Sequence, residues 1–243
     1  MNDAITSRQT RILKSIIDEY IETADAVGSE SLEKKYNLGI SPATIRNEML
    51  VLSKAGYLKQ LHTSAGRVPT PKAMKFYVDQ LMEERQMSLS DEVRAKEDVW
   101  DARKDFNRLM DEVAHALANQ TQSLAVVAID GEDKLWHAGY SNIFKNPEFA
   151  NLSQVSGIFS LLDEVERLQE LFFAQITGEF PVEVLFGEDI GWPELFPTGI
   201  VATQFTVGSK NGILCVIGPM RLRYNMVIPI IRYFGNLVQE IME

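Results

Sequence analysis

Apolar residues recur with a helical period in two short segments at the start of the chain. Over residues 6–22 they form a single stripe, which is typical of an amphipathic helix that packs one face on a core. Residues 25–29 interrupt this pattern, and a shorter helix is expected over 29–36. Asn37 and Gly39 end that helix, because both residue types tolerate the left-handed backbone conformation that follows a helix.

A third helix is marked by clear signals at both of its ends. Ser41 can accept a hydrogen bond from the free N–H groups of the first turn, and Pro42 suits the first helical position. Gly56 ends the helix. The expected buried stripe consists of three apolar residues at helical spacing, Ile45, Met49 and Leu52. Two short strands are expected at 57–61 and 67–70, with a turn between them at 63–66. A further helix at 71–85 completes the region.

The remainder of the chain alternates amphipathic helices with strand-like apolar runs. Helices are expected over 99–117, 152–175 and 225–242. The strand-like runs lie at 124–129, 134–141, 182–186, 200–207 and 212–217. This order of elements predicts an antiparallel sheet with helices packed on it, an α+β fold. We therefore expect a first domain at 1–85, a polar linker at 86–96 and a larger second domain at 97–243.

Three short helices followed by a hairpin form the layout of a winged helix-turn-helix, in which the third helix enters the DNA major groove. Opposite its buried stripe, this helix carries side chains that can pair with bases or phosphates. Arg can bind guanine and Asn can bind adenine in a bidentate manner, and a helix start suits a phosphate oxygen. The candidate DNA-binding residues on the helix are Ser41, Thr44, Arg46, Asn47 and Lys54. The hairpin, or wing, adds His62, Thr63, Ser64 and Arg67.

The distribution of charge supports this prediction, although the net charge of −10 does not. Residues 1–80 contain 11 Lys and Arg against 9 Asp and Glu, whereas residues 81–243 contain 13 against 25. Within 40–75, six basic residues stand against one acid, Glu48. Such asymmetry is typical of a nucleic-acid-binding end that is joined to a domain with another task.

Several segments make the comparison with known proteins specific. The runs GISPATIRNEM at 39–49 and GYLKQLHTSAGRVPT at 56–70 closely resemble the HrcA family, the bacterial heat-inducible transcription repressors. YIETADAVGSESL at 20–32 and VIGPMRLRY at 216–224 are similar to two further segments of that family. The resemblance implies a winged-helix domain followed by a GAF-like α+β domain, and a dimer bound to an inverted-repeat operator in double-stranded DNA. It also implies repression of chaperone genes, release on heat stress, dependence on the chaperonin GroEL, and a cytoplasmic, nucleoid-associated location.

The chain departs from the family pattern in two places. Its second domain leaves no room for the dimerisation segment that is usually inserted there, so the chain resembles a short form. The segment LVLSKAG at 50–56 is less acidic than is usual at the end of the third helix. We nevertheless expect a homodimer through the second domain, with the helix at 99–117 placed to set the spacing of two DNA-binding heads.

No motif in the sequence indicates an enzyme, a cofactor or a metal. His115 lies among apolar helix residues, which is typical of a core or partly exposed histidine rather than of a ligand. His137 has no Cys, Asp or Glu at metal-ligand spacing, and Cys215 lies in an apolar strand where burial keeps a thiol inert. A single cysteine fits a reducing compartment, and neither a signal peptide nor a membrane span is expected. Two other interpretations stay open: a winged-helix regulator that senses a metabolite through its second domain, and an interaction module whose winged helix binds protein.

Overall fold

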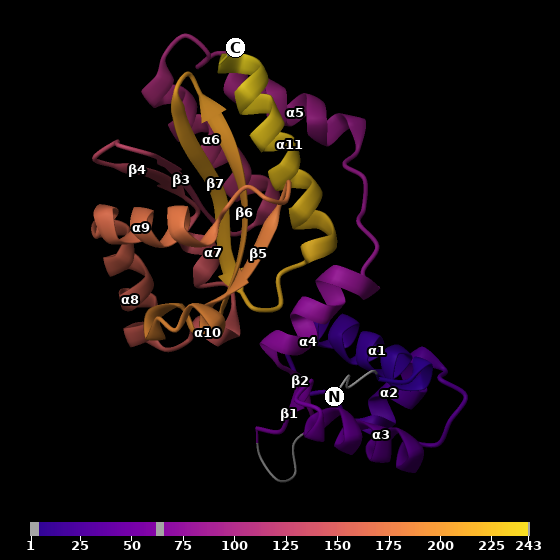
Figure 1. Ribbon diagram of the computed structural model, residues 1–243. Helices are drawn as coiled ribbons and strands as arrows, with labels where there is room; N and C mark the ends of the chain where they lie inside the picture. Colours follow the sequence, from indigo (N-terminus) through magenta and orange to yellow (C-terminus); the bar gives the residue numbers. More distant parts are fainter. Residues whose placement is uncertain (1–4, 62–65, 243) are drawn as a thin grey trace. The chain divides into compact units, whose positions relative to one another are not determined.

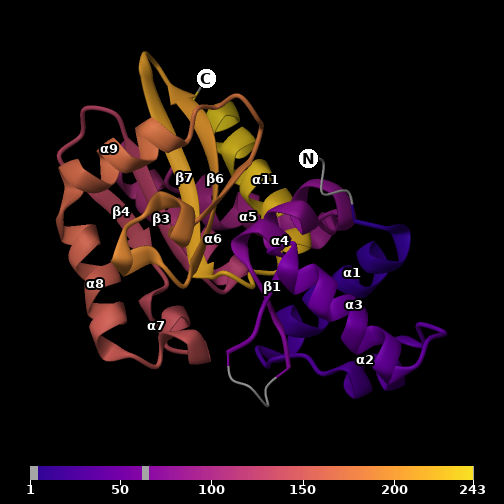
Figure 2. The same ribbon diagram turned by 60° about the horizontal axis from the view of Figure 1, so that its bottom comes forward.

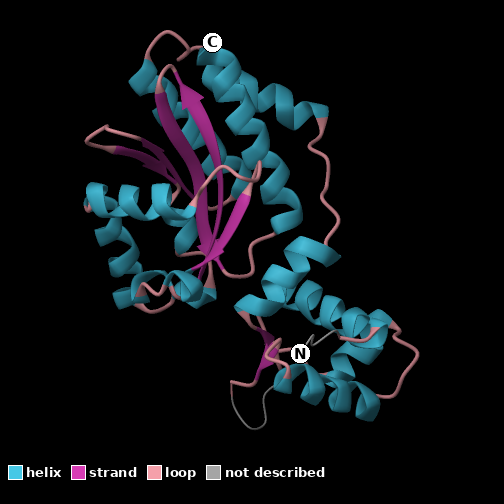
Figure 3. Cartoon of the chain, viewed as in Figure 1, coloured by secondary structure: helices cyan, strands magenta, loops and turns pink. Residues whose placement is uncertain are grey.

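The computed structural model describes residues 5–61 and 66–242, which form two compact units at 1–83 and 84–243. Helices dominate both units, and the larger sheet belongs to the second (Figure 3). The predicted α+β class is confirmed, because helices are combined with purely antiparallel strands. Within the described ranges, no helix has the length and apolar character needed to cross a bilayer.

The first unit consists of helices and one small hairpin. Its helices are α1 (Ser7–Thr23), α2 (Ser29–Tyr36), α3 (Pro42–Lys54) and α4 (Pro71–Phe76), and α4 continues into a π-helical turn, η1 (Tyr77–Leu81). The hairpin pairs β1 (Leu58–Lys59) with β2 (Val68–Pro69). Both strands are shorter than expected, and the last helix ends at Leu81 rather than at Arg85.

The core of the first unit lies between α1, α2 and α3. The apolar stripe of α1 meets Leu32 of α2 and the stripe of α3, and these side chains are almost completely excluded from solvent. Thr6 caps α1 reciprocally: its Oγ1 accepts from the Gln9 N–H, and the Gln9 side chain accepts from the Thr6 N–H. Apolar burial of this kind, reinforced by capped helix starts, is what stabilises a small helical unit.

The second unit is built on an antiparallel sheet with strand order β4-β3-β7-β6-β5 (Figure 1). The strands are β3 (Leu124–Ile129), β4 (Leu135–Ala138), β5 (Glu183–Phe186), β6 (Thr198–Val207) and β7 (Lys210–Pro219). The main helices are α5 (Leu89–Trp100), α6 (Phe106–Thr121), α8 (Leu152–Asp163), α9 (Val165–Gln175) and α11 (Tyr224–Met242). Short helical turns fill the connections: α7 (Tyr140–Ile143), η2 (Pro147–Phe149), α10 (Gly187–Ile190) and η3 (Pro193–Leu195).

Both faces of this sheet are covered by helices, α6 and α11 on one side and α8 and α9 on the other (Figures 1 and 2). Alternate residues of β3 and β7 therefore point into two cores. Val126 and Cys215 pack with the side chains of α8 and α9, and the intervening residues face α6 and α11. Burial on both faces explains why β3 reads as a continuous apolar run.

Three expected boundaries were wrong. Most of the segment expected as a linker, 86–96, lies in α5, which Ser88 caps by accepting from the Asp91 N–H. The helix expected over 99–117 is divided, since α5 ends at Trp100 and Asp105 caps the start of α6. The helix expected over 152–175 is also two helices, because the non-helical backbone of Glu164 (φ −90°, ψ 64°) separates α8 from α9.

Candidate nucleic-acid interface

The inner face of α3 fixes how this helix is presented. Ile45 and Leu52 are completely buried and Met49 nearly so, which confirms the predicted stripe. Pro42 occupies the first turn, as its lack of an N–H favours. With one face packed on α1 and α2, the opposite face of α3 is directed to solvent.

The outer face of α3 brings together the side chains expected to contact bases. Arg46, Asn47 and Lys54 are all exposed there. Among the residues that the structure describes, none of the three uses its side chain in a hydrogen bond or an ion pair, so their donors are available to a ligand. Leu50 and Val51, which could have packed on a neighbouring helix, are instead 44% and 48% exposed on the same outer side.

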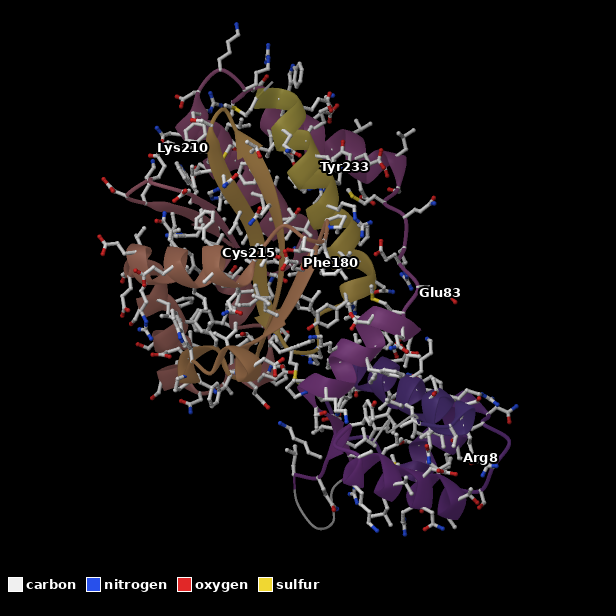
Figure 4. All side chains as sticks on the ribbon, in the orientation of Figure 1. Arg8, Glu83, Phe180, Lys210, Cys215 and Tyr233 are labelled. Atoms are coloured by element: carbon white, nitrogen blue, oxygen red, sulfur yellow. The ribbon has the colours of Figure 1, made fainter. Side chains whose placement is uncertain are left out.

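The one acidic residue of this region is withdrawn from the outer face. Glu48 is directed to α1, where Arg8 Nη1 lies 3.3 Å from its Oε1 and Gln9 Nε2 donates to its Oε2 at 3.0 Å. Arg8 is labelled in Figure 4. This arrangement neutralises the carboxylate that would otherwise repel a phosphate backbone, and it leaves the cations of α3 uncompensated.

Ser41 and Thr44 serve first to begin the helix. Ser41 Oγ accepts from the Thr44 N–H at 3.3 Å, and the two hydroxyl groups lie 3.0 Å apart. The pair therefore satisfies part of the exposed helix start. Backbone N–H groups at such a start attract anions, so the position suits a phosphate oxygen.

Arg67 lies where the hairpin meets α3. Its backbone forms a two-way bridge with Val27, each N–H donating to the other carbonyl at 2.9 Å. Its Nε donates to Ser53 Oγ at 3.3 Å, which draws the guanidinium toward the last turns of α3. The other three expected wing residues, His62, Thr63 and Ser64, lie outside the described residues.

Lys72 is a contributor that the sequence did not single out. Its Nζ donates to the Ala55 carbonyl at 2.8 Å and stands 4.5 Å from the centre of the Tyr57 ring. A cation at this point complements the negative end of the α3 dipole and adds positive charge beside the hairpin. The sequence did not predict this contact, because Lys72 is distant from α3 along the chain.

Two titratable groups of the second unit, Cys215 and His137, are buried or already engaged in the structure. The described part of the chain holds no group of three or more His, Cys, Asp or Glu residues placed to bind a metal ion. Burial raises the pKa of the Cys215 thiol, so the group stays protonated inside the sheet (Figure 4). His137 is engaged with Tyr140, whose hydroxyl lies 2.5 Å from its Nδ1. An open groove of about 600 Å³ is lined mostly by carboxylates, at 131–133, 163–167 and Gln169.

Comparison with known proteins decides the family. The model of the HrcA protein C terminal domain matches residues 72–228, well over half of the chain. The chain belongs to the HrcA family. Curated HrcA proteins are named heat-inducible transcription repressors, and the family is one of repressors rather than of enzymes.

Individual HrcA relatives match both locally and over the whole chain. The repressor of Carboxydothermus hydrogenoformans is 26% identical, and the alignment covers 98% of each protein. That alignment runs over 337 residues although the present chain has 243, so a long stretch of the relative has no counterpart here. The repressor of Acetivibrio thermocellus is 42% identical over 125 residues, which cover 51% of this chain and 36% of that protein.

A solved structure shows the same fold. A crystal structure titled as that of a hypothetical protein superposes with a TM-score of 0.76 at 18% identity, covering 98% of this chain and 99% of the other. At this level of identity, the likeness concerns the fold alone.

The HrcA-like segment at 216–224 stabilises the end of β7 and the start of α11 in the second unit. Arg221 clamps the carboxylate of Glu148 through Nε at 2.5 Å and Nη2 at 3.2 Å. Tyr224 is fully buried, and its hydroxyl donates to the Met220 carbonyl at 2.7 Å. A side chain at Gly199 would collide with that hydroxyl, so the strand end is shaped around it. The segment therefore fixes the turn from β7 into α11, a role that the sequence pattern alone did not predict.

Proposed function

We propose that this protein is a DNA-binding repressor of heat-shock (chaperone) genes that binds an inverted-repeat operator as a homodimer and is released on heat stress. In this proposal, residues 1–85 are a winged helix-turn-helix domain with α3 as the recognition helix. Residues 97–243 are a GAF-like regulatory and dimerisation domain. The HrcA family membership supports the repressor role and, through the resemblance, a dependence on the chaperonin GroEL.

The observation that carries the proposal is the asymmetry of α3. Arg46, Asn47 and Lys54 share the outer face with unengaged side chains, while Glu48 is bound to α1. Uncompensated cations on a face without an acid favour a polyanion such as the phosphate backbone of DNA. We assign base contacts to Arg46 and Asn47, and phosphate contacts to Lys54, Arg67 and the helix start at Ser41 and Thr44. His62, Thr63 and Ser64 extend the assignment to the wing.

In vitro selection from a randomised duplex library, followed by titration, tests this function. The full chain is titrated with the selected duplex and with a scrambled duplex of equal length, at about 50 and about 200 mM salt. We expect the selected duplex to contain an inverted repeat and to bind at least about 10³-fold more tightly than the scrambled one. Affinity for both should fall steeply with salt. No enrichment during selection, or equal and salt-independent affinities, would contradict DNA recognition.

A further inference from the structure

One side chain at the start of α1 joins that helix to α3. Gln9 uses both ends of its amide: Oε1 accepts from the Thr6 N–H at 2.9 Å, and Nε2 donates to Glu48 Oε2 at 3.0 Å. The first bond belongs to the cap of α1, and the second crosses to α3. The amide cannot turn over without losing both bonds, because its donor and its acceptor would then face the wrong partners. Gln9 therefore holds the Glu48 carboxylate in a fixed place.

Glu48 stands at the edge between the buried and the outer face of α3. At 100° per residue it lies about 60° from Ile45, on the flank of the buried stripe. It also follows Thr44 by one turn, at the i, i+4 spacing that places two Cβ atoms about 5–6 Å apart. Thr44 and Ser41 form the helix start to which the proposed function assigns a phosphate contact. The carboxylate can thus be directed either to α1 or toward the position of that phosphate.

The contacts with α1 direct Glu48 away from the helix start. Its side chain is only 18% exposed, whereas that of Arg8, its ion-pair partner at 3.3 Å, is 61% exposed. An ion pair with so exposed a partner is weakened by water and by salt. The bond from Gln9 is partly buried and is a hydrogen bond to a charged acceptor, so it is the stronger of the two restraints.

We propose that Gln9 is a positioning residue for DNA binding, which holds the Glu48 carboxylate on α1 and so keeps the start of α3 attractive to a phosphate. The inference rests on the proposed function, because it concerns how tightly α3 binds DNA. A carboxylate released toward Thr44 would stand beside a DNA phosphate, and like charges at an interface repel each other. Gln9 acts through Glu48 and makes no contact with DNA itself.

The chemistry of position 9 explains why an amide serves there and a carboxylate would not. Glutamate can also accept from the N–H of the capping residue, since the capping box uses either glutamate or glutamine. It cannot donate to Glu48, however, and its charge would repel that carboxylate. Gln9→Glu should therefore keep α1 capped while it releases Glu48. One substitution thus separates the two bonds of the amide.

Fluorescence anisotropy of the full chain with the selected and the scrambled duplex tests the proposal at about 50 mM salt. We expect Gln9→Glu to bind both duplexes at least about tenfold more weakly than the wild type, since a phosphate contact carries no sequence information. The deficit should shrink at about 200 mM salt, because salt screens the repulsion. Glu48→Gln alone should change the affinity by less than about twofold, since the carboxylate that it removes is already turned away from DNA.

Exchange of the two groups provides the decisive comparison. In the double variant Q9E/E48Q, the carboxylate at position 9 accepts from the amide at position 48, so the bond forms again with its direction reversed. We expect this double variant to bind DNA within about twofold of the wild type, because the two substitutions compensate each other. A double variant as weak as Gln9→Glu, or a wild-type affinity in Gln9→Glu itself, would overturn the proposal.

Thr6→Val is the control for a general loss of stability in α1. It removes the hydroxyl that accepts from the Gln9 N–H, but it leaves both bonds of the Gln9 amide in place. We expect Thr6→Val to unfold at a lower temperature, measured by circular dichroism, and to bind DNA as the wild type does. If Thr6→Val weakens DNA binding as much as Gln9→Glu does, the effect is one of folding and the positioning role is wrong.

The same titrations separate this inference from the proposed function. If the wild type binds the selected duplex and Gln9→Glu binds it equally well, Gln9 has no positioning role and the repressor proposal stands. If the wild type binds neither duplex, the proposed function is wrong and this inference falls with it.

Discussion

Helices α3 and α5 share a construction but differ in what they present to solvent. Each buries an apolar stripe and leaves large side chains exposed on the opposite face. On α3 the outer face carries cations and an amide with no acid among them, because Glu48 is bound to α1. On α5 the exposed side combines apolar side chains, such as Leu89 and Trp100, with charges of both signs, such as Arg94 and Glu97.

The difference teaches that two amphipathic helices can bury similar stripes and still differ in how well their outer faces suit DNA. Uncompensated cations favour a polyanion, whose phosphates release counterions on binding. A face on which acids and bases alternate with apolar side chains, as on α5, has no such preference for a polyanion. Burial alone does not distinguish the two exposed faces, because both consist of side chains that are accessible to solvent.

The largest effect is expected where the α3 face is supported. Ile45→Ala removes a completely buried side chain and leaves a cavity, so the free energy of unfolding should fall by about 2–5 kcal/mol. Urea denaturation followed by far-ultraviolet circular dichroism measures the change. Leu50→Ala, on the exposed face of the same helix, should change it by less than about 0.5 kcal/mol. Similar losses from both variants would remove the distinction between the two faces.

A smaller effect is expected for base recognition by α3. Asn47→Ala should weaken binding to the selected duplex by about 1–3 kcal/mol, because a bidentate contact to one base is lost. Binding to scrambled DNA should hardly change. Fluorescence anisotropy with labelled duplexes measures both affinities. An equal loss on the two duplexes would reassign Asn47 to the DNA backbone.

The wing contact predicts a change in salt dependence. Arg67→Ala should reduce the slope of log affinity against log salt by about one and weaken all duplexes alike, since one phosphate contact disappears. Its bond to Ser53 requires a stability control, because truncation also removes a contact to α3. If the slope is unchanged while the variant remains folded, Arg67 only joins the hairpin to α3.

The smallest effect concerns the anchoring of α5. Hydrogen bonds from Arg232 lower the pKa of Glu84 from its ordinary value of 4.5. The ion pair therefore contributes its full stabilisation above about pH 4.5, and this contribution is lost as the pH falls through the lowered pKa of Glu84. Glu84→Gln should cost about 0.2–1 kcal/mol at pH 7, because the pair is partly exposed, and progressively less as the pH falls through the lowered pKa. Thermal unfolding over a series of pH values from 7 downward measures this, and a cost that does not change with pH would exclude the ion pair as its cause.

Local signals in the sequence predicted the first unit well. The Ser41-Pro42 start and the stripe at Ile45, Met49 and Leu52 occur in the structure as expected, because cap and periodicity act within a few residues. The strands of the second unit were also found, with boundaries shifted by a few residues.

Contacts between distant parts of the chain explain what the sequence did not show. The segment at 86–96 was read as a linker because α5 buries only small or widely spaced apolar residues, such as Ala95 and Val99. The clamp between Arg221 and Glu148, and the placement of Lys72 below α3, depend on tertiary folding. The periodicity of apolar residues along the sequence cannot reveal such contacts. The assignment of individual DNA contacts remains a prediction from residue chemistry.

The central claim is that α3 presents a face suited to DNA and α5 does not, and photo-crosslinking tests it most directly. A p-benzoylphenylalanine is placed at Leu50 of α3 or at Leu89 of α5, two exposed positions, and the full chain is irradiated with the selected duplex. The account predicts protein–DNA adducts from Leu50 and none from Leu89. The absence of DNA adducts from Leu50, or DNA adducts of equal yield from both positions, would contradict it.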